Sequence, residues 1–502
     1  MYEVRKTGGS WAALRRVARG LVPAALGLAA APAAAQSQAQ ASHDPALSLA
    51  TFDSAWTAIH RTHFDTAFNG VDWDALRAEL RPRAAAAGTP DELRAVVQEM
   101  LGRLEQSHFY LIPSDVRSTL TAEAEALPGS EAEGEAEGDV PPAAEEVVED
   151  DAEAGPGDAG MQVRRVDGRF VVTRVTPGGA AEAAGIRTGW IVEAVDGRVA
   201  EEVLSALRSL EGSADPRALE AVGVGVFTSA LGGPAGSTAR VRLVGGDGRP
   251  VTLDLVRAVS TATRTKFGNL PEMPVTLERE RVKLPDGTTV GVIRFDVWMP
   301  AISRAFDQAV DELRDADGIV LDLRGNPGGV GAMAMGISGH FIDEALSLGT
   351  MSTRGDVLRF VVNPRRVDTR GRLVKPYAGP VAILTDALSA STSEVFAGGM
   401  QGLGRARVFG ETTAGQALPA YMSRLPNGDV LVHAFASFTG PRGEPMEGKG
   451  VVPDEAAPPT RAELLAGRDP ALEAAKRWIS QQKRSGAAAR RTGPDHLTRS
   501  EG

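Results

Sequence analysis

The chain has 502 residues, of which 43% are hydrophobic and 24% are charged, and it contains no cysteine. This composition is ordinary for a globular protein, and at roughly 100–200 residues per domain it predicts two to four domains. The lack of cysteine excludes disulfides and thiol catalysis, and the formal net charge of -11 argues against nucleic acid as the main partner.

The first 35 residues have the order of a secretory signal peptide. Basic residues come first, then the short apolar run LVPAALGLAAA, then small residues ending in AAAQ, so cleavage is expected near Ala35. The apolar run is too short to span a bilayer. We therefore expect residues 1–35 to direct export to the periplasm or the medium and no integral membrane segment to remain. A disordered Ala-rich leader or an interfacial anchor is the alternative.

Residues 45–120 show the apolar spacing of an N-terminal helical domain. Thr89 and Pro90 suit the N-cap and first position of a helix. The apolar residues that follow keep the three-and-four spacing of one buried helix face. This domain ends at the pair Ser107-His108.

Two segments are too polar to bury a core. Residues 121–158 are rich in Glu, Ala, Gly and Pro, with almost no large apolar side chains, which predicts an acidic disordered linker. An acidic binding tail is the less favoured interpretation. The last residues, 482–502, are also polar, and we expect a disordered tail there.

Residues 159–258 carry short alternating strands separated by DG and GDG turns, with a helix expected near 201–211. The segment GMQV, followed by VTPGGAAEAAGIRTGWIVEAVDG, resembles a PDZ domain. The resemblance implies a carboxylate-binding loop where a peptide C-terminus adds as an extra strand. The residues of this loop are Gly160, Met161, Gln162 and Val163. A PDZ fold that only packs against its neighbours and binds nothing is the alternative.

Strand and helix patterns alternate from about 270 to 462, which predicts a parallel α/β unit. Within it, DALSASTSEVFAGGMQ places three serines between an apolar strand and a helix. A serine there lies near the helix N-terminus, where the helix dipole favours developing negative charge. The same serine is also a common N-cap, and Ser391 with Glu394 fits a capping box. The loop GNPGG suits an oxyanion hole better than a phosphate cradle, because no GK[ST] follows it.

The segments GIVLDLRGNPGG, SASTSEVFAGGMQGLGRARVFGETTAG and EGKGVVPD resemble the S41 serine peptidases, which include the C-terminal processing and tricorn core proteases. The resemblance covers most of residues 50–460. It implies a multidomain α/β protein with an N-terminal helical domain, a PDZ-like β domain and a crotonase-like α/β catalytic core at 270–462. It places the nucleophile at Ser391, the central serine of the SASxSE pattern.

The chain departs from the processing proteases at the catalytic base. Those enzymes use a Ser-Lys dyad, but the corresponding stretch reads TTAGQAL, and Gln416 stands where the lysine is expected. A glutamine amide has no basic nitrogen and cannot accept the serine proton. The tricorn-like alternative implies His108 as base, with Ser107 beside it and Glu447 completing a tetrad. An ordinary histidine pKa of about 6.5 suits this task.

The resemblance places one oxyanion donor on the backbone of Gly328 or Gly329, and the second is expected on the N–H of Thr392. We therefore expect a serine endopeptidase that cleaves polypeptides through an acyl-enzyme, without metal or cofactor, and engages its substrates near their C-termini through the PDZ-like groove. A catalytically inactive relative that binds peptides as a scaffold is the competing hypothesis. A crotonase-type acyl-CoA enzyme is a third.

Overall fold

The computed structural model describes residues 44–114, 156–208, 216–260, 262–265 and 273–492. The expected signal peptide and residues 121–155 of the expected linker lie outside the described residues. The prediction of disorder is wrong for the end of that linker. Pro156–Asp158 forms strand β2, because it pairs with β7 (Gly232–Pro234) and β10 (Ala258–Val259). No helix in these ranges is long and apolar enough to cross a membrane.

The N-terminal unit is helical, as predicted. Its elements are α2 (Pro45–Thr62), the 3-10 turn η1 (Phe68–Gly70), α3 (Trp73–Ala85) and α4 (Pro90–Gly102). Each α-helix begins after a residue whose side-chain oxygen accepts a backbone N–H, namely Asp44, Asp72 or Thr89. The three helices bury their apolar faces against one another.

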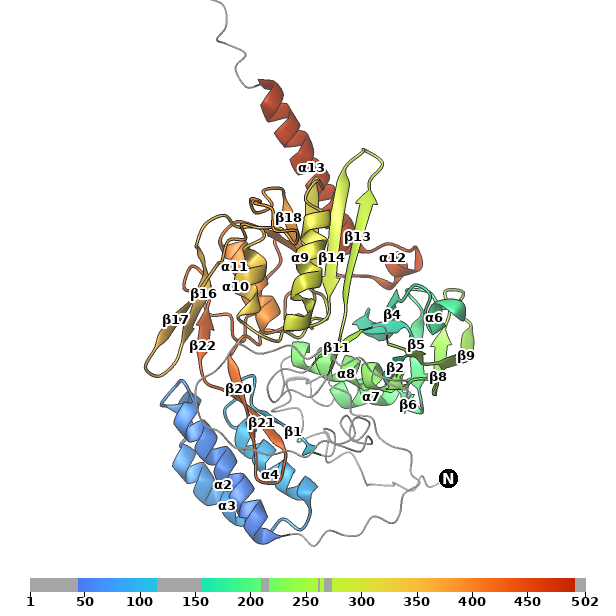
Figure 1. Cartoon of the computed structure of the whole chain (residues 1–502). Coiled ribbons are helices and arrows are strands. Elements are labelled where there is room, and N and C mark those ends of the chain that lie inside the picture. The colour runs from blue at the N-terminus through green and yellow to red at the C-terminus, as the bar shows by residue number, and fades with distance from the viewer. Residues whose placement is uncertain (1–43, 115–155, 209–215, 261, 266–272, 493–502) are drawn as a thin grey trace, which may run out of the picture.

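A small sheet joins this unit to the rest of the molecule. Strand β1 (Tyr110–Ile112) pairs with β21 (Val430–Ala434), which pairs with β20 (Ala420–Arg424). In Figure 1 the β20–β21 hairpin reaches from the core to the blue helices. The buried Asp429 accepts hydrogen bonds from Arg94 and from the backbone N–H of Ser114. Residues 107–108 are thereby held against the core.

The second unit is built on an antiparallel sheet in the order β3-β4-β5-β8-β9, with β6 paired to β5. Its elements are β3 (Met161–Val166), β4 (Arg169–Val175), α6 (Ala180–Ala183), β5 (Ile191–Val195), β6 (Arg198–Val199), α7 (Ala200–Arg208), α8 (Pro216–Leu231), β8 (Thr238–Val244) and β9 (Pro250–Val256). Strand β3 is an edge strand, and α8 packs beside it.

The core is a six-stranded sheet in the order β13-β14-β15-β18-β19-β23, antiparallel only between its first two strands. The strands are β13 (Leu277–Lys283), β14 (Thr289–Phe295), β15 (Gly318–Asp322), β18 (Val381–Thr385), β19 (Arg407–Gly410) and β23 (Glu455–Ala456). The helices are η2 (Pro300–Ile302), α9 (Ser303–Glu312), α10 (Met333–Ser338), α11 (Thr392–Gly402), α12 (Arg461–Leu465) and α13 (Pro470–Thr492). Two smaller sheets, β17-β16-β22 and β11-β12, accompany it; their strands are β16 (Ser347–Ser352), β17 (Val357–Val361), β22 (Ser437–Thr439), β11 (Thr263–Thr265) and β12 (Met273–Val275).

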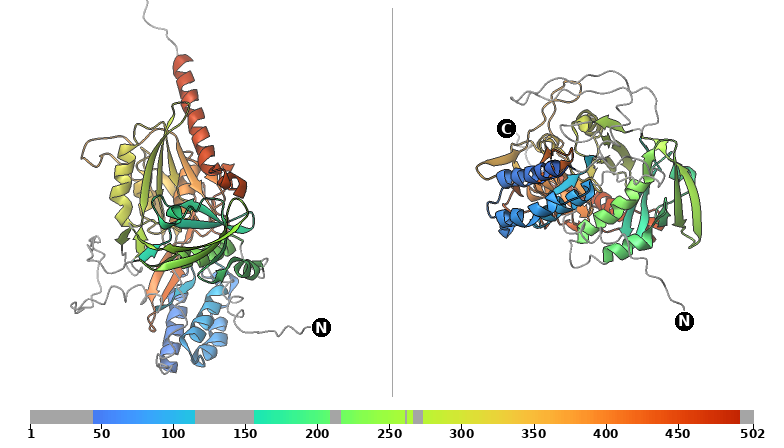
Figure 2. Two further views of the ribbon diagram at one scale, coloured as in Figure 1. Left: turned by 90° about the vertical axis from the view of Figure 1, so that its right-hand side faces the viewer. Right: turned by 90° about the horizontal axis from the view of Figure 1, so that it is seen from below.

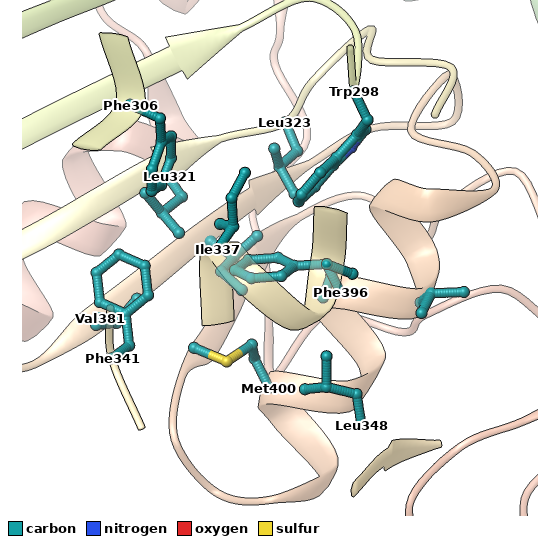
Figure 3. Close-up of a cluster of buried hydrophobic side chains, with 14 of the residues drawn as sticks. Trp298, Phe306, Leu321, Leu323, Ile337, Phe341, Leu348, Val381, Phe396 and Met400 are labelled. Carbon is teal, nitrogen blue, oxygen red and sulfur yellow. The ribbon is translucent and has the colours of Figure 1, made fainter. Parts of the chain in front are cut away.

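Successive side chains of β15 point to opposite faces of the sheet, and different helices cover each face. Ile319 and Leu321 pack with the cluster under α9, α10 and α11, part of which Figure 3 shows, whereas Val320 packs with α13 on the other face. The left view of Figure 2 shows the sheet between α9 and α13. The sequences of β15 (GIVLD) and β18 (VAILT) are almost wholly apolar, because both faces of these strands are buried.

The predicted disorder from residue 482 is wrong for its first part, because α13 runs through Thr492. The helix starts by burying Ala471, Ala475 and Ile479 on the sheet, and good helix formers carry it onward. The α/β core expected at 270–462 therefore extends past 462.

Candidate active site

The three serines before α11 have different surroundings. Ser389 Oγ donates to Leu323 O at 2.8 Å, and Ser393 Oγ donates to Asn326 O at 3.0 Å; both residues are 0% exposed. Ser391 is half-buried and remains accessible. Only the middle serine is therefore placed to react with a substrate.

Ser391 sits at a sharp turn between β18 and α11. Its φ of 54° is in the left-handed region, which a non-glycine residue adopts only when its surroundings hold it there. Its N–H donates to Gln416 O at 2.9 Å and to Glu394 Oε2 at 3.1 Å. Ser391 and Glu394 form the expected capping box. Ser391 therefore caps α11 while its side chain stays accessible.

The GNPGG loop lies directly against this turn. A Cβ added to Gly328, which has φ 102°, would lie 2.6 Å from Ser391 Cβ, so only glycine fits there. The Thr392 hydroxyl donates to Gly329 O at 2.9 Å. The Gly328 N–H donates to Asn326 Oδ1 at 3.0 Å, whereas within the described ranges no acceptor faces the N–H groups of Gly329 and Thr392.

Ion pairs brace the base of this loop. Asp322 accepts from the backbone and guanidinium of Arg324 and from Arg294. Burial acts to raise the pKa of Asp322, but these two arginines hold it well below its ordinary value. Arg324 also pairs with Asp469. The loop is thus tied to β14 and to the start of α13.

Ser107, His108 and Glu447 form a hydrogen-bonded chain. Glu447 accepts from Ser107 N at 3.0 Å and from Ser107 Oγ at 3.1 Å. Ser107 Oγ lies 2.8 Å from His108 Nδ1. If the serine hydrogen points to the carboxylate, Ser107 Oγ accepts from Nδ1–H and leaves Nε2 as a free base.

His108 has φ 61° and is half-buried in a low-polarity setting. Burial lowers the pKa of His108 to about 4, so the imidazole is neutral at physiological pH. Burial also raises the pKa of Glu447, and the hydrogen bonds from Ser107 and Ala417 oppose that shift. Across the described residues, no hydrogen bond links His108 to Ser391.

Gln416 and Ala417 connect Ser391 to the hydrogen-bonded chain of Glu447, Ser107 and His108. Gln416 O accepts from Ser391 N, and Ala417 N donates to Glu447 Oε2 at 2.9 Å. The side chain of Gln416 is 7% exposed. It makes no hydrogen bond to any part of the chain that the structure describes. Ser391 and Glu447 therefore bind consecutive residues of one segment, and Ser107 and His108 are joined to that segment through Glu447.

The predicted peptide loop at 160–163 lies at the start of β3. Met161 and Val163 point into the core of their own unit, and Gln162 Oε1 accepts from Arg294 at 2.9 Å. The Gly160 N–H donates to Asp158 Oδ1 at 2.6 Å. A charged cavity of about 460 Å³ lies between β3, α8 and the core, with Arg164, Glu220 and Asp386 in its wall; Ser391 and His108 are not among its lining residues.

One site residue had no sequence signal. Arg217, on α8 of the second unit, donates to Thr413 O at 2.9 Å, Gly448 O at 2.7 Å and Lys449 O at 2.9 Å. It thereby joins the segment that contacts Ser391 to the segment that carries Glu447. Nothing in the local pattern around Arg217 distinguishes it from the other arginines of the chain.

Comparisons with known proteins agree with this architecture. Residues 289–457 match the model of peptidase family S41, and residues 49–102 match the tricorn protease C1 domain. A carboxyl-terminal-processing protease of Picosynechococcus sp. is 25% identical over 411 residues, covering 80% of this chain and 82% of that protein. The chloroplastic carboxyl-terminal-processing peptidase 2 of Arabidopsis thaliana is 25% identical over 413 residues, covering 81% and 68%.

A solved photosystem II D1 C-terminal processing protease shares the fold, with a TM-score of 0.50 and 22% identity over 84% of this chain and 98% of that one. The fold and the matched segments define one class, the serine peptidases. Within that class, residues 289–457 form a domain of peptidase family S41.

Proposed function

We propose that the protein is an exported endopeptidase that works through an acyl-enzyme on Ser391, with His108 as the base and with Ser107 and Glu447 holding His108. The observation that carries this proposal is the hydrogen-bonded chain Glu447–Ser107–His108, which meets Ser391 across Gln416 and Ala417. A Ser-Lys dyad is unsuitable because Gln416 cannot take a proton.

In the proposed reaction, Ser391 Oγ attacks the peptide carbonyl carbon while its proton passes to His108 Nε2. The imidazolium then protonates the leaving amine as the C–N bond breaks, which leaves an ester on Ser391. Water then attacks this ester and gives a proton to His108 Nε2, and His108 returns that proton to Ser391 Oγ as the ester C–O bond breaks and the new carboxyl group leaves. Ser107 and Glu447 keep Nδ1 protonated, so that Nε2 is the basic nitrogen throughout.

The carbonyl oxygen becomes negative in both steps and needs fixed donors. We assign the N–H groups of Gly329 and Thr392, whose residues are linked through the Thr392 hydroxyl. Between the two expected glycines, Gly329 is the better donor, because the Gly328 N–H is already bonded to Asn326.

For the substrate we propose polypeptides cut near their C-termini, as the names of the relatives describe for those proteins. The peptide would add to the edge strand β3 beside α8, with its carboxylate at the loop 160–163 of a PDZ-like unit. The leader at 1–35 supports export as part of this proposal.

A fluorophosphonate probe, which labels activated serines, tests the assignment. We expect labelling of the wild type, none in Ser391→Ala, and labelling slowed by roughly 10³-fold or more in His108→Ala. Labelling that persists in Ser391→Ala would show another nucleophile. Wild-type rates in His108→Ala would exclude the tetrad, and an unlabelled wild type would exclude the proposed function.

A further inference from the structure

A fully buried carboxylate lies directly beside the proposed nucleophile. Glu394, in the first turn of α11, is 0% exposed. It accepts four hydrogen bonds: from Thr413 Oγ1 at 2.5 Å, Gly415 N at 2.7 Å, Gln416 N at 2.8 Å and Ser391 N at 3.1 Å. An ordinary capping glutamate contacts only its own helix start, so three of these contacts require another explanation.

We propose that Glu394 is a positioning residue for Ser391. Its ionised carboxylate ties the strained peptide unit of Ser391 to the segment 413–416. It thereby holds the nucleophile, and the Thr392 N–H that follows it, in reactive geometry. This proposal rests on the proposed role of Ser391 and adds a group that never touches the substrate.

The geometry suits the ionised form. Three of the four partners are backbone N–H groups, which can only donate. The fourth, Thr413 Oγ1, donates to Glu394 Oε1 at 2.5 Å and accepts from Val451 N at 2.6 Å. A proton on Glu394 would face these donors and remove at least one of the hydrogen bonds that hold Ser391.

Burial raises the pKa of Glu394 to about 7, and the four hydrogen bonds oppose that shift. Three charged or titratable groups are joined to the same segment: Arg217 donates to Thr413 O, Glu447 accepts from Ala417 N, and His108 is joined to Glu447 through Ser107. The elements packed on α11 present apolar side chains to it: Leu348, Ile337 and Val408. The raised pKa implies that Glu394 gains its proton as the pH falls through about 7, where His108 is still neutral.

The experiment measures the rate of fluorophosphonate labelling of the full chain between pH 5 and 9. We expect the wild-type rate to fall as the pH drops through about 7. Glu394→Gln should label about 100-fold more slowly at pH 8, because a displaced nucleophile loses rate of this order. Thr413→Val removes one donor and should move the midpoint to higher pH, whereas Thr413→Ser should restore it.

Glu463→Gln is the matched control, because Glu463 holds the same capping position in α12, where Thr460 donates to it. We expect it to label like the wild type. A folded Glu394→Gln variant with the wild-type rate, or an unmoved midpoint in Thr413→Val, overturns the proposal. If Glu394→Gln does not fold, the comparison of Thr413→Val with Thr413→Ser tests the proposal by itself. An unlabelled wild type would overturn the Ser391 assignment as well, which separates the two failures.

Discussion

Ser391 and His108 both have a positive φ, of 54° and 61°, which is uncommon for residues other than glycine, yet the molecule holds them in different ways. The turn at Ser391 is fixed within the core, by Glu394, by the 413–416 segment and by the glycine loop. His108 belongs to the helical unit and is anchored through Ser107 to Glu447, 340 positions away. The position of the proposed nucleophile thus depends on the fold of the core, whereas the position of the proposed base also depends on the docking of the helical unit.

This difference predicts two classes of substitution with different effects on the reaction. Changes in the core that displace Ser391 should slow its reaction strongly, with or without urea. Changes that loosen the helical unit should leave the nucleophile formed but weaken its base. The following predictions use substitutions on either side of this division.

The largest effect among them is expected for Glu447→Gln. The amide keeps the size of the side chain but loses the charge that fixes the hydrogens of Ser107 and His108, so His108 no longer presents a basic Nε2. We expect peptide hydrolysis to fall by roughly 10²–10⁴-fold, the range seen when the residue that orients a catalytic histidine is neutralised. Hydrolysis of casein measures it. Glu444→Gln, three residues earlier and paired with Arg442 at the surface, should keep the wild-type rate; equal loss in both would exclude the relay.

Asp429→Ala should loosen the docking of the helical unit. Asp429 is 0% exposed and pairs with Arg94, and removing one partner of a buried pair costs about 3–5 kcal/mol. We expect lower stability in urea, and a labelling rate reduced about tenfold at urea concentrations where the core remains folded, because His108 is less well held. The exposed pair Arg103–Glu79 supplies the control, since Glu79→Ala should cost about 0–1 kcal/mol. Unchanged labelling in a destabilised Asp429→Ala variant would show that docking does not position the base.

The sequence predicted the elements around Ser391 better than the contacts of His108. Apolar runs predicted β15 and β18, and the serine-rich segment after β18 predicted a turn and the start of a helix, because these features depend on neighbours in the chain. The choice of Ser391 among the three serines came from the family resemblance, and its role as nucleophile stays a prediction. Ser107, His108 and Glu447 were found only through family resemblance, since no local pattern predicts that residues 340 positions apart share a hydrogen bond.

Other features escaped prediction for the same physical reason. Strand β2 follows an acidic segment and owes its order to partners about 75 and 100 positions away. Glu394 fitted a capping box, but its bonds to Thr413, Gly415 and Gln416 depend on how a later loop returns to α11. Arg217 has its role only because α8 lies against the core. Local patterns predict elements, and tertiary packing decides which polar side chains meet.

Arg217→Met tests how far the second unit supports the site. The three carbonyls that Arg217 binds belong to the segments that contact Ser391 and carry Glu447. We expect kcat/KM for casein to fall about tenfold, with the loss mainly in kcat, because positioning rather than substrate contact is lost. Arg208→Met on α7, which removes an exposed ion pair with Glu201, should have no effect. A loss confined to KM would indicate substrate binding by Arg217 instead.

The smallest expected effect is the pH dependence of the stability that the neutral His108 side chain contributes. Burial lowers the pKa of His108 to about 4, below its value of about 6.5 in the unfolded chain. Between these values the unfolded chain binds more protons, so the stability is fully present above pH 6.5 and is lost as the pH falls toward 4. His108→Gln has no such proton to bind, so the difference in urea midpoint between wild type and variant should shrink from pH 7 to pH 4.5. His433, whose pKa burial also lowers to about 4, is present in both proteins and cancels in this difference. Parallel midpoints across the range would mean that His108 is solvated, and a solvated imidazole would be free to take a different position relative to Ser391.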